Sequence, residues 1–135
     1  MKKLRFTVLG SGSSGGVPRI GGIWGDCDPN NPKNRRRRCS LLVEQIHDKE
    51  TTTILIDTSP DLRDQLLDAN VKRLDGVFYT HYHADHIHGS DDLRMLVFNM
   101  KERINVFADK QTKNNLLDRF NYAFNKPKTS PYPPI

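Results

Sequence analysis

The alternation of apolar and polar residues predicts a first half that is rich in β-strands. Residues 4–9, 40–47 and 52–57 are short apolar or β-branched runs, each typical of a strand. The polar residues 48–50 between the second and third runs predict a turn that pairs those two strands as a hairpin. Residues 10–39 are rich in Gly, Pro, Asn and Arg, and they predict a long structureless loop. Loops of this length are usually functional or disordered.

The second half brings in apolar positions at helical spacing. A helix is predicted from near Pro60 to Asn70, with Thr58 or Ser59 as its N-cap. A second helix is predicted to follow Ser90, which would cap it. The expected apolar positions are Leu62, Leu66 and Leu67 on the first helix, and Leu93, Leu96 and Val97 on the second.

Two more strands, at residues 75–80 and 104–108, and a helix at residues 109–122 complete the pattern. The tail, residues 126–135, contains four prolines and is expected to form no regular structure by itself. Strands that lead and then alternate with helices predict an α/β fold, with helices on one face of a mixed sheet. The other face of the sheet must also be shielded from water, and the chain has few residues left to do so. We therefore expect an exposed apolar sheet face and self-association as a homodimer.

Composition narrows the class of protein. The 135 residues suffice for one core. No apolar run approaches the roughly 20 residues of a membrane helix. Cys27 and Cys39 are too few for a disulfide framework, so we expect a cytoplasmic protein. Much of the net charge of +5 comes from four arginines at residues 35–38. That run is either a solvated loop or a patch that faces phosphate. The other charges are mixed, so a broad nucleic-acid-binding face is not favoured.

The candidate chemistry lies in a histidine cluster. Four of the five histidines occur between residues 81 and 88, at the C-terminal end of a predicted strand, where open α/β sheets place their sites. His81 and His83, two residues apart, can face one metal ion, and Asp85 and His86 can face a second. Imidazole and carboxylate suit zinc, and also manganese or iron. The alternative is a surface histidine loop that binds no metal. His88 lies outside the motif and is expected to support the ligands or the local structure.

These residues resemble a known family. The segment HYHADH at residues 81–86 is typical of the metallo-β-lactamase superfamily, and residues 54–58 resemble its strand-ending aspartate. The likeness is strongest to the phosphoribosyl cyclic phosphodiesterase branch. It is carried by LGSGSSGGVPRIGG at residues 9–22, the Cys27 loop, the arginine run before Cys39, and LIDTSPDLR at residues 55–63. The resemblance implies that residues 1–135 form one partial domain, the N-terminal half of an αββα sandwich.

The resemblance also implies a mechanism. His81 and His83 would hold one divalent metal, and Asp85 and His86 the other, with zinc expected ahead of manganese or iron. A metal-bound hydroxide would attack the phosphorus of a small phosphate ester, and Asp85 would also take the proton of the attacking water. Asp57 would steady the metal loop through hydrogen bonds, with a simple turn-forming aspartate as the alternative.

The chain departs from the family in its length. Family members are about twice as long, and their second half supplies another histidine, a bridging aspartate and a last histidine. No histidine follows His88 here. Each metal would have two protein ligands, against the three usual in catalytic sites. We therefore expect a missing C-terminal half or a partner to complete the site, which leaves open whether this chain alone is active. The alternatives are a non-catalytic remnant or interaction module, and a nucleic-acid-binding or nuclease-related piece that uses the arginine run and Trp24.

Two further features predict phosphate contacts. Residues 10–15 match G-x-G-x-x-G, but the glycines and proline that follow prevent the helix that a dinucleotide fold needs. Backbone N–H groups at Gly12, Ser13 and Ser14 could still cradle a phosphate, or the loop is simply flexible. Arg94 is either a phosphate clamp or the partner of a neighbouring acid.

Overall fold

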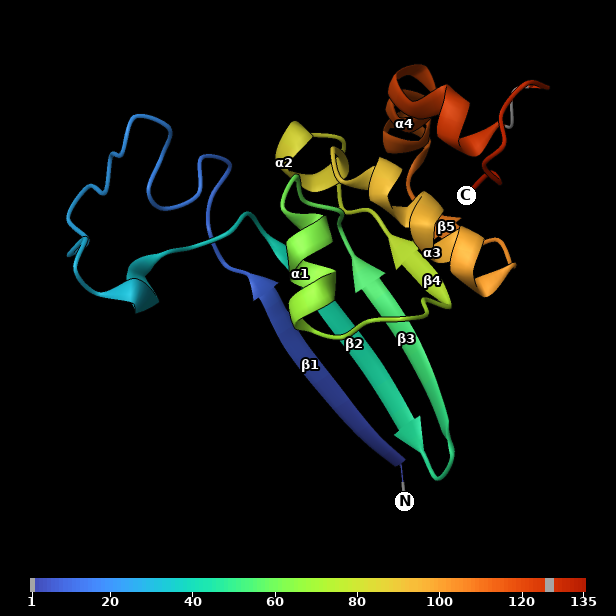
Figure 1. Cartoon of the computed structure of the whole chain (residues 1–135), viewed down its shortest axis with the longest axis horizontal. Coiled ribbons are helices and arrows are strands. Elements are labelled where there is room, and N and C mark those ends of the chain that lie inside the picture. Colours follow the sequence, from blue (N-terminus) through green and yellow to red (C-terminus); the bar gives the residue numbers. More distant parts are fainter. Residues whose placement is uncertain (1, 126–127) are drawn as a thin grey trace.

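A five-stranded mixed sheet organises the chain (Figure 1), and the computed structural model describes residues 2–125 and 128–135. The strands are β1 (Lys2–Gly10), β2 (Ser40–His47), β3 (Glu50–Ile56), β4 (Gly76–Phe78) and β5 (Asn105–Phe107). They lie in the order β1-β2-β3-β4-β5. The first three pair antiparallel, and β3, β4 and β5 pair parallel. The predicted mixed sheet and the β2–β3 hairpin are confirmed.

Helices cover one face of this sheet. They are α1 (Leu62–Asp68), α2 (Ala84–Ile87), α3 (Leu93–Met100) and α4 (Lys110–Phe124), with the short 3-10 turns η1 (Pro32–Asn34) and η2 (Ser90–Asp92). α1 and α3 lie side by side over the sheet in Figure 1. The Asp109 carboxylate accepts a hydrogen bond from the Thr112 N–H at 2.7 Å and so caps α4.

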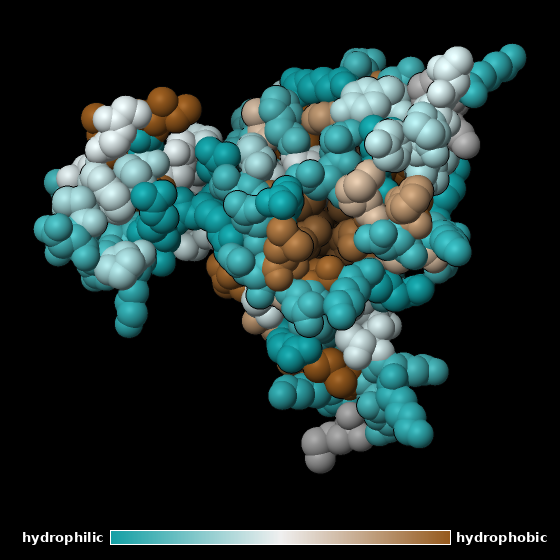
Figure 2. Space-filling view, viewed as in Figure 1, coloured by the Kyte–Doolittle hydropathy of each residue, from teal (hydrophilic) through white to brown (hydrophobic). Residues whose placement is uncertain are grey.

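The core lies between the sheet and these helices. Alternate residues of the central strands point into it, among them Leu42, Leu55 and Val77. The helices contribute the predicted positions Leu62, Leu66, Leu93, Leu96 and Val97, all of them buried. Figure 2 shows that hydrophobic side chains also line a hollow on this side, between α1 and α3.

The opposite face of the sheet is apolar and exposed. The strand register places Val8, Leu41, Ile56, Phe78 and Phe107 in one row across all five strands. The Phe78 and Phe107 rings stack with centroids 4.5 Å apart, yet the two residues are 42% and 48% exposed. The expectation of an uncovered apolar sheet face is therefore confirmed for the described part of the chain.

Neither predicted serine is the N-cap of its helix. The buried Ser59 hydroxyl donates to Gln65 Oε1 at 2.8 Å and accepts from the Asp61 N–H at 3.1 Å. The helix α1 begins at Leu62, two residues after the predicted start near Pro60, and Asp61 is its N-cap. The Ser90 hydroxyl donates to the Ile87 carbonyl at 2.6 Å and lies in η2 instead of capping α3. Thr58 is likewise fully buried and forms no cap.

Other local predictions need smaller corrections. The strand expected at residues 75–80 is limited to β4, and the motif that follows contains an unpredicted helix, α2. Leu67 is 62% exposed and does not belong to the core. The loop at residues 10–39 is not structureless, because isolated bridges such as Val17 to Arg36 fold it back on itself. In the tail, residues 126–127 lie outside the described residues. Residues 128–135 form no helix or strand, as expected, although Ile135 is buried.

Candidate metal centre

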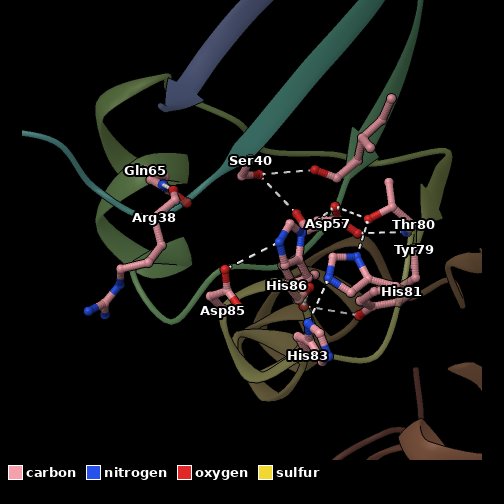
Figure 3. Close-up of polar contacts among 12 residues, drawn as sticks. Arg38, Ser40, Asp57, Gln65, Tyr79, Thr80, His81, His83, Asp85 and His86 are labelled. Carbon is pink, nitrogen blue, oxygen red and sulfur yellow. Dashed lines mark hydrogen bonds and ion pairs between the residues drawn. The ribbon is translucent and has the colours of Figure 1, made fainter. Parts of the chain in front are cut away.

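The histidine motif occupies the turn between β4 and α2. His81 and His83 precede the helix, with extended backbone at His83, whereas Asp85 and His86 lie in the helix itself. In Figure 3, His83 lies next to His81, and Asp85 lies next to His86, whose ring reaches Asp57. The predicted order, a histidine pair followed by an Asp–His pair after a turn, is the order found.

Asp57 anchors this turn from the end of β3. Its carboxylate is 4% exposed and accepts three hydrogen bonds. Oδ1 accepts from the Thr80 N–H at 2.8 Å, while Oδ2 accepts from the Thr80 hydroxyl at 2.7 Å and from His86 Nδ1 at 2.8 Å. The residue has a positive φ of 60°, which Asp tolerates better than most side chains. The Asp57 side chain therefore holds Thr80 and His86 in place, which goes beyond the role of a simple turn-forming aspartate.

These bonds determine which nitrogens of two histidines carry protons. A carboxylate can only accept, so His86 Nδ1 must donate to Asp57. The Thr80 hydroxyl gives its proton to Asp57 and must accept from His81 Nδ1, 3.0 Å away. In the neutral rings, Nε2 of both His81 and His86 then carries a lone pair, which His81 directs toward His83 Nδ1. A hydrogen-bonded Nδ1 is the usual way in which proteins orient a metal-binding histidine.

The donor atoms form two pairs whose separations fit metal ions. His81 Nε2 lies 3.1 Å from His83 Nδ1, and His86 Nε2 lies 3.2 Å from Asp85 Oδ2. Two nitrogens that each lie 2.0–2.1 Å from a tetrahedral zinc would be about 3.3 Å apart. The second pair brings a lone pair toward a carboxylate oxygen, an arrangement that a cation or a proton between them stabilises. The residues thus fit two half sites.

Neither pair is complete by itself. Among residues 2–125 and 128–135, no group of three or more His, Cys, Asp or Glu side chains is arranged to hold a metal ion. Catalytic zinc usually has three protein ligands. Metal binding by these four residues therefore stays a prediction, and so does proton transfer by Asp85.

A buried hydroxyl cluster that the sequence did not reveal supports the turn. The Tyr79 hydroxyl lies 2.7 Å from Ser90 Oγ and 3.2 Å from Thr58 Oγ1. Burial raises the pKa of Tyr79 to about 12, so it stays a neutral phenol. The Thr58 N–H also donates to the His86 carbonyl at 2.8 Å. The cluster therefore ties α2 to the end of β3.

The start of β2 borders the same centre. The Ser40 hydroxyl donates to the Asp57 carbonyl at 2.9 Å. Loss of water contact around the neighbouring Cys39 thiol, followed by the charges of Asp57 and Asp85, raises the Cys39 pKa. Cys27 and Cys39 are both free.

Two of the predicted phosphate contacts, Gly12 and Arg94, have hydrogen-bond partners within the chain. The Gly12 N–H donates to the Arg37 carbonyl at 2.8 Å, so it is not free to cradle a phosphate. Ser13 and Ser14 are exposed, and phosphate binding by them stays a prediction. Arg94 donates to Asp91 at 3.1 Å, with its guanidinium over two tyrosine rings. Of the two roles that the sequence left open for Arg94, the structure shows the pairing with a neighbouring acid.

His88 is the remaining predicted site residue. It is exposed, and its ring meets the Phe120 ring edge-on with centroids 5.9 Å apart. Within the described residues it has no hydrogen bond to the other motif side chains. A supporting role for His88 at the metal centre stays a prediction.

The arginine run holds the long loop to α1. Arg38 pairs with Asp61 at 2.8 Å, and Arg37 pairs with Asp68 at 2.7 Å. Gln65, fully buried, donates to the Arg38 carbonyl at 2.8 Å. Two of the four guanidinium groups are thus neutralised, which reduces the positive charge that the run could offer to phosphate.

A mixed α/β sheet with a histidine–aspartate turn at its strand ends defines a class of metal-dependent hydrolases. Residues 52–134 match the family described as "Beta-lactamase superfamily domain". The chain belongs to this family, and its sheet and helices correspond to the N-terminal half of the metallo-β-lactamase fold.

Solved structures agree with this assignment. A "New Diphosphatase from the PhnP Family" is 40% identical, with a TM-score of 0.76 over 89% of this chain and 47% of that one. Zn(2+)-bound PqqB from Methylobacterium extorquens is 19% identical and shares the fold, with a TM-score of 0.59 over 87% of this chain and 40% of that one. The superfamily generally binds divalent metals.

One curated relative carries a different name. An "Octanoyltransferase" of Porphyromonas gingivalis (strain ATCC BAA-308 / W83) is 39% identical over 96% of this chain, but the match spans only 25% of that protein. The chain thus covers a quarter of this relative and less than half of the diphosphatase. Among the described residues, no helix has the length and apolar character needed to cross a membrane.

Proposed function

We propose that this chain provides half of the active site of a metal-dependent hydrolase that acts on phosphodiester substrates related to phosphoribosyl cyclic phosphates. One observation carries the proposal: Asp57 orients two histidines so that two donor pairs, 3.1 Å and 3.2 Å apart, lie at the ends of β3 and β4. His81 and His83 would hold one metal, and Asp85 and His86 the other. Bound divalent metals, zinc first among them, would polarise a phosphoryl oxygen and activate water.

The residues of this chain would position the reaction. Asp57 and Thr80 keep the imidazole rings in the orientation that exposes Nε2. The Asp85 carboxylate is 15% exposed, so it can exchange a proton with a water molecule at the site. The 40% identity to a protein named as a diphosphatase supports a phosphate ester over other substrates.

Completion of the site is part of the proposal. Each donor pair needs a third ligand, which further chain or a second copy would supply. The exposed row of apolar residues on the sheet supports such an association, because large apolar patches mark interaction sites. Light scattering should detect dimers that the variant Phe78→Ser/Phe107→Ser weakens. Strictly monomeric protein at high concentration would contradict self-association.

Metal content tests the central claim. The chain, purified without added metal, should retain near-stoichiometric divalent metal by elemental analysis, and the variant Asp85→Ala/His86→Ala should lose it. His47→Ala is the matched control, because His47 is an exposed histidine at the end of β2. Equal metal in the native chain and the double variant would overturn the proposal, and absence of metal from the native chain would overturn completion of the site by a second copy of it.

Substrate assays test the rest. Hydrolysis of bis(p-nitrophenyl) phosphate and of a ribosyl cyclic phosphate should require metal and fall in the double variant. The curated relative named as an octanoyltransferase makes acyl transfer the second candidate. Preferential cleavage of p-nitrophenyl octanoate would favour that candidate. Bound metal without either activity would favour a non-catalytic module.

A further inference from the structure

The helix α4 touches the histidine motif at two points. Arg119 Nη1 donates to the Tyr82 carbonyl at 3.0 Å, and the Phe120 ring meets the His88 ring edge-on with centroids 5.9 Å apart. The helix departs from helical geometry at Phe120, where φ is −122° and ψ is 29°. Arg119 and Tyr82 are 37 positions apart in the sequence, so the bond between them exists only in the folded chain.

The backbone of His81 and Tyr82 has little other support. Both residues lie between β4 and α2, outside any helix or strand. Among residues 2–125 and 128–135, the bond from Arg119 is the only hydrogen bond made by the backbone of either residue. The guanidinium is charged, and hydrogen bonds with a charged partner are roughly twice as strong as neutral ones. The direction of the Tyr82 carbonyl therefore depends on Arg119.

His83 is the histidine of the proposed metal centre that the Asp57 carboxylate does not orient. Asp57 and Thr80 hold the rings of the other two histidines through their Nδ1 atoms. His83 Nδ1 instead faces His81 Nε2 at 3.1 Å, and within the described residues no side chain outside the motif bonds to the His83 ring. The direction of this ring therefore depends on the backbone that carries it. Arg119 holds the peptide group directly before it.

We propose that Arg119 is a positioning residue for the proposed metal centre, which holds the Tyr82–His83 peptide group and so fixes the direction of the His83 ring. The inference rests on the proposed function, in which His83 is a metal ligand. Loss of the guanidinium would let this peptide group rotate, and His83 would then spend time in directions that cannot share a metal ion with His81. Residues that orient metal-binding histidines typically contribute about 10- to 100-fold to metal affinity.

Imidazole ¹⁵N–¹H spectra recorded in EDTA test the positioning without any metal. Arg119→Met keeps an unbranched apolar stem and removes every N–H donor of the side chain. We expect it to shift the ring signals of His83 and to leave those of His86 unchanged, because Asp57 holds His86 independently. Arg119→Lys should restore the His83 signals in part, because Lys keeps the charge and loses the planar fork. Arg63→Met is the matched control, since it removes an exposed arginine on α1, and it should move neither set of signals.

Zinc titration measures the consequence for the proposed site. Arg119→Met should raise the Kd for zinc about tenfold, and Arg119→Lys should raise it less. The control Arg63→Met should leave the Kd unchanged within about twofold, because its guanidinium pairs with Asp64 on the surface.

The possible results separate the two proposals. His83 signals that do not move in Arg119→Met would overturn the inference. Equal shifts of His83 and His86 together with a lower melting temperature would also overturn it, because they would show general support of the fold. Zinc bound equally tightly by the native chain and by Arg119→Met would overturn the positioning role and leave the hydrolase proposal intact.

The opposite combination is equally distinct. A native chain that binds no zinc, but whose His83 signals depend on Arg119, would support the positioning role while metal binding by this chain alone fails. If Arg119→Met does not fold, Arg119→Lys decides, because native His83 signals in that variant would mean that the guanidinium does not position the ring.

Discussion

Replacement of Asp57 by Asn should disable the proposed metal centre while the backbone is preserved. Asn tolerates the positive φ of 60° as Asp does. Its carbonyl oxygen can still accept from the Thr80 N–H, but an NH₂ group replaces the oxygen that accepts from the Thr80 hydroxyl and from His86. That NH₂ group is a donor, so His86 must move its proton to Nε2, the nitrogen that the metal needs.

The size of the effect follows from these contacts. All three hydrogen bonds to the charged carboxylate become neutral ones, a difference of about 1 kcal/mol each. The Asp57 and His86 side chains are only 4% and 16% exposed, so water replaces little of the loss. We expect the free energy of unfolding to fall by about 2–3 kcal/mol. Zinc affinity should fall about 10- to 100-fold, as for other residues that orient metal-binding histidines.

Urea denaturation followed by circular dichroism in EDTA measures the first effect, and zinc titration measures the second. Asp68→Asn is the matched control, because its carboxylate is 69% exposed and pairs with Arg37 on the surface. The control should change stability by less than about 0.5 kcal/mol. An Asp57→Asn protein as stable as the control, with unaltered zinc affinity, would refute the reasoning.

Three further predictions concern the same region. Thr80→Val removes the hydroxyl that orients His81, so imidazole ¹⁵N shifts should report a mixture of its tautomers; an unchanged single tautomer would contradict the hydrogen-bond assignment. Alkylation of Cys39, followed by peptide mapping at several pH values, should show a midpoint above that of a free thiol. Asp85→Asn should lower the midpoint, because a nearby negative charge disfavours the thiolate; a midpoint that does not move would exclude this charge as a cause. Gly89→Ala should destabilise the fold by about 1–3 kcal/mol or more, because a Cβ there would overlap the backbone carbonyl that precedes α1; an unchanged melting temperature would show that this contact relaxes freely.

The sequence by itself determined the elements and the chemistry of the motif. Strands such as residues 40–47 are visible because alternation and β-branched residues are local signals. The spacing of His81, His83, Asp85 and His86 likewise fixes which donors the turn can present. The family resemblance carried by these residues is confirmed by the match over residues 52–134.

Only the tertiary structure decided the partners of each polar group. Serine is a residue type that favours helix N-caps. In the structure, however, the buried hydroxyls of Ser59 and Ser90 donate to Gln65 and to the Ile87 carbonyl, and neither serine is an N-cap. Asp57 reaches Thr80 and His86 across more than twenty residues because β3 and β4 lie side by side in the sheet. Propensity and periodicity describe a residue's neighbours along the chain, whereas these contacts depend on how distant segments pack.

The same distinction applies to charge. The sequence showed a run of arginines but not that Asp61, the N-cap of α1, and Asp68, its last residue, neutralise two of them. It drew no attention to Arg119, whose guanidinium reaches the Tyr82 carbonyl only because α4 folds against the histidine motif. The charge of each residue can be read from the sequence. Which carboxylates lie close enough to neutralise it depends on how distant segments pack. The sequence therefore determined which groups could bind, and the fold decided which of them remain free to do so.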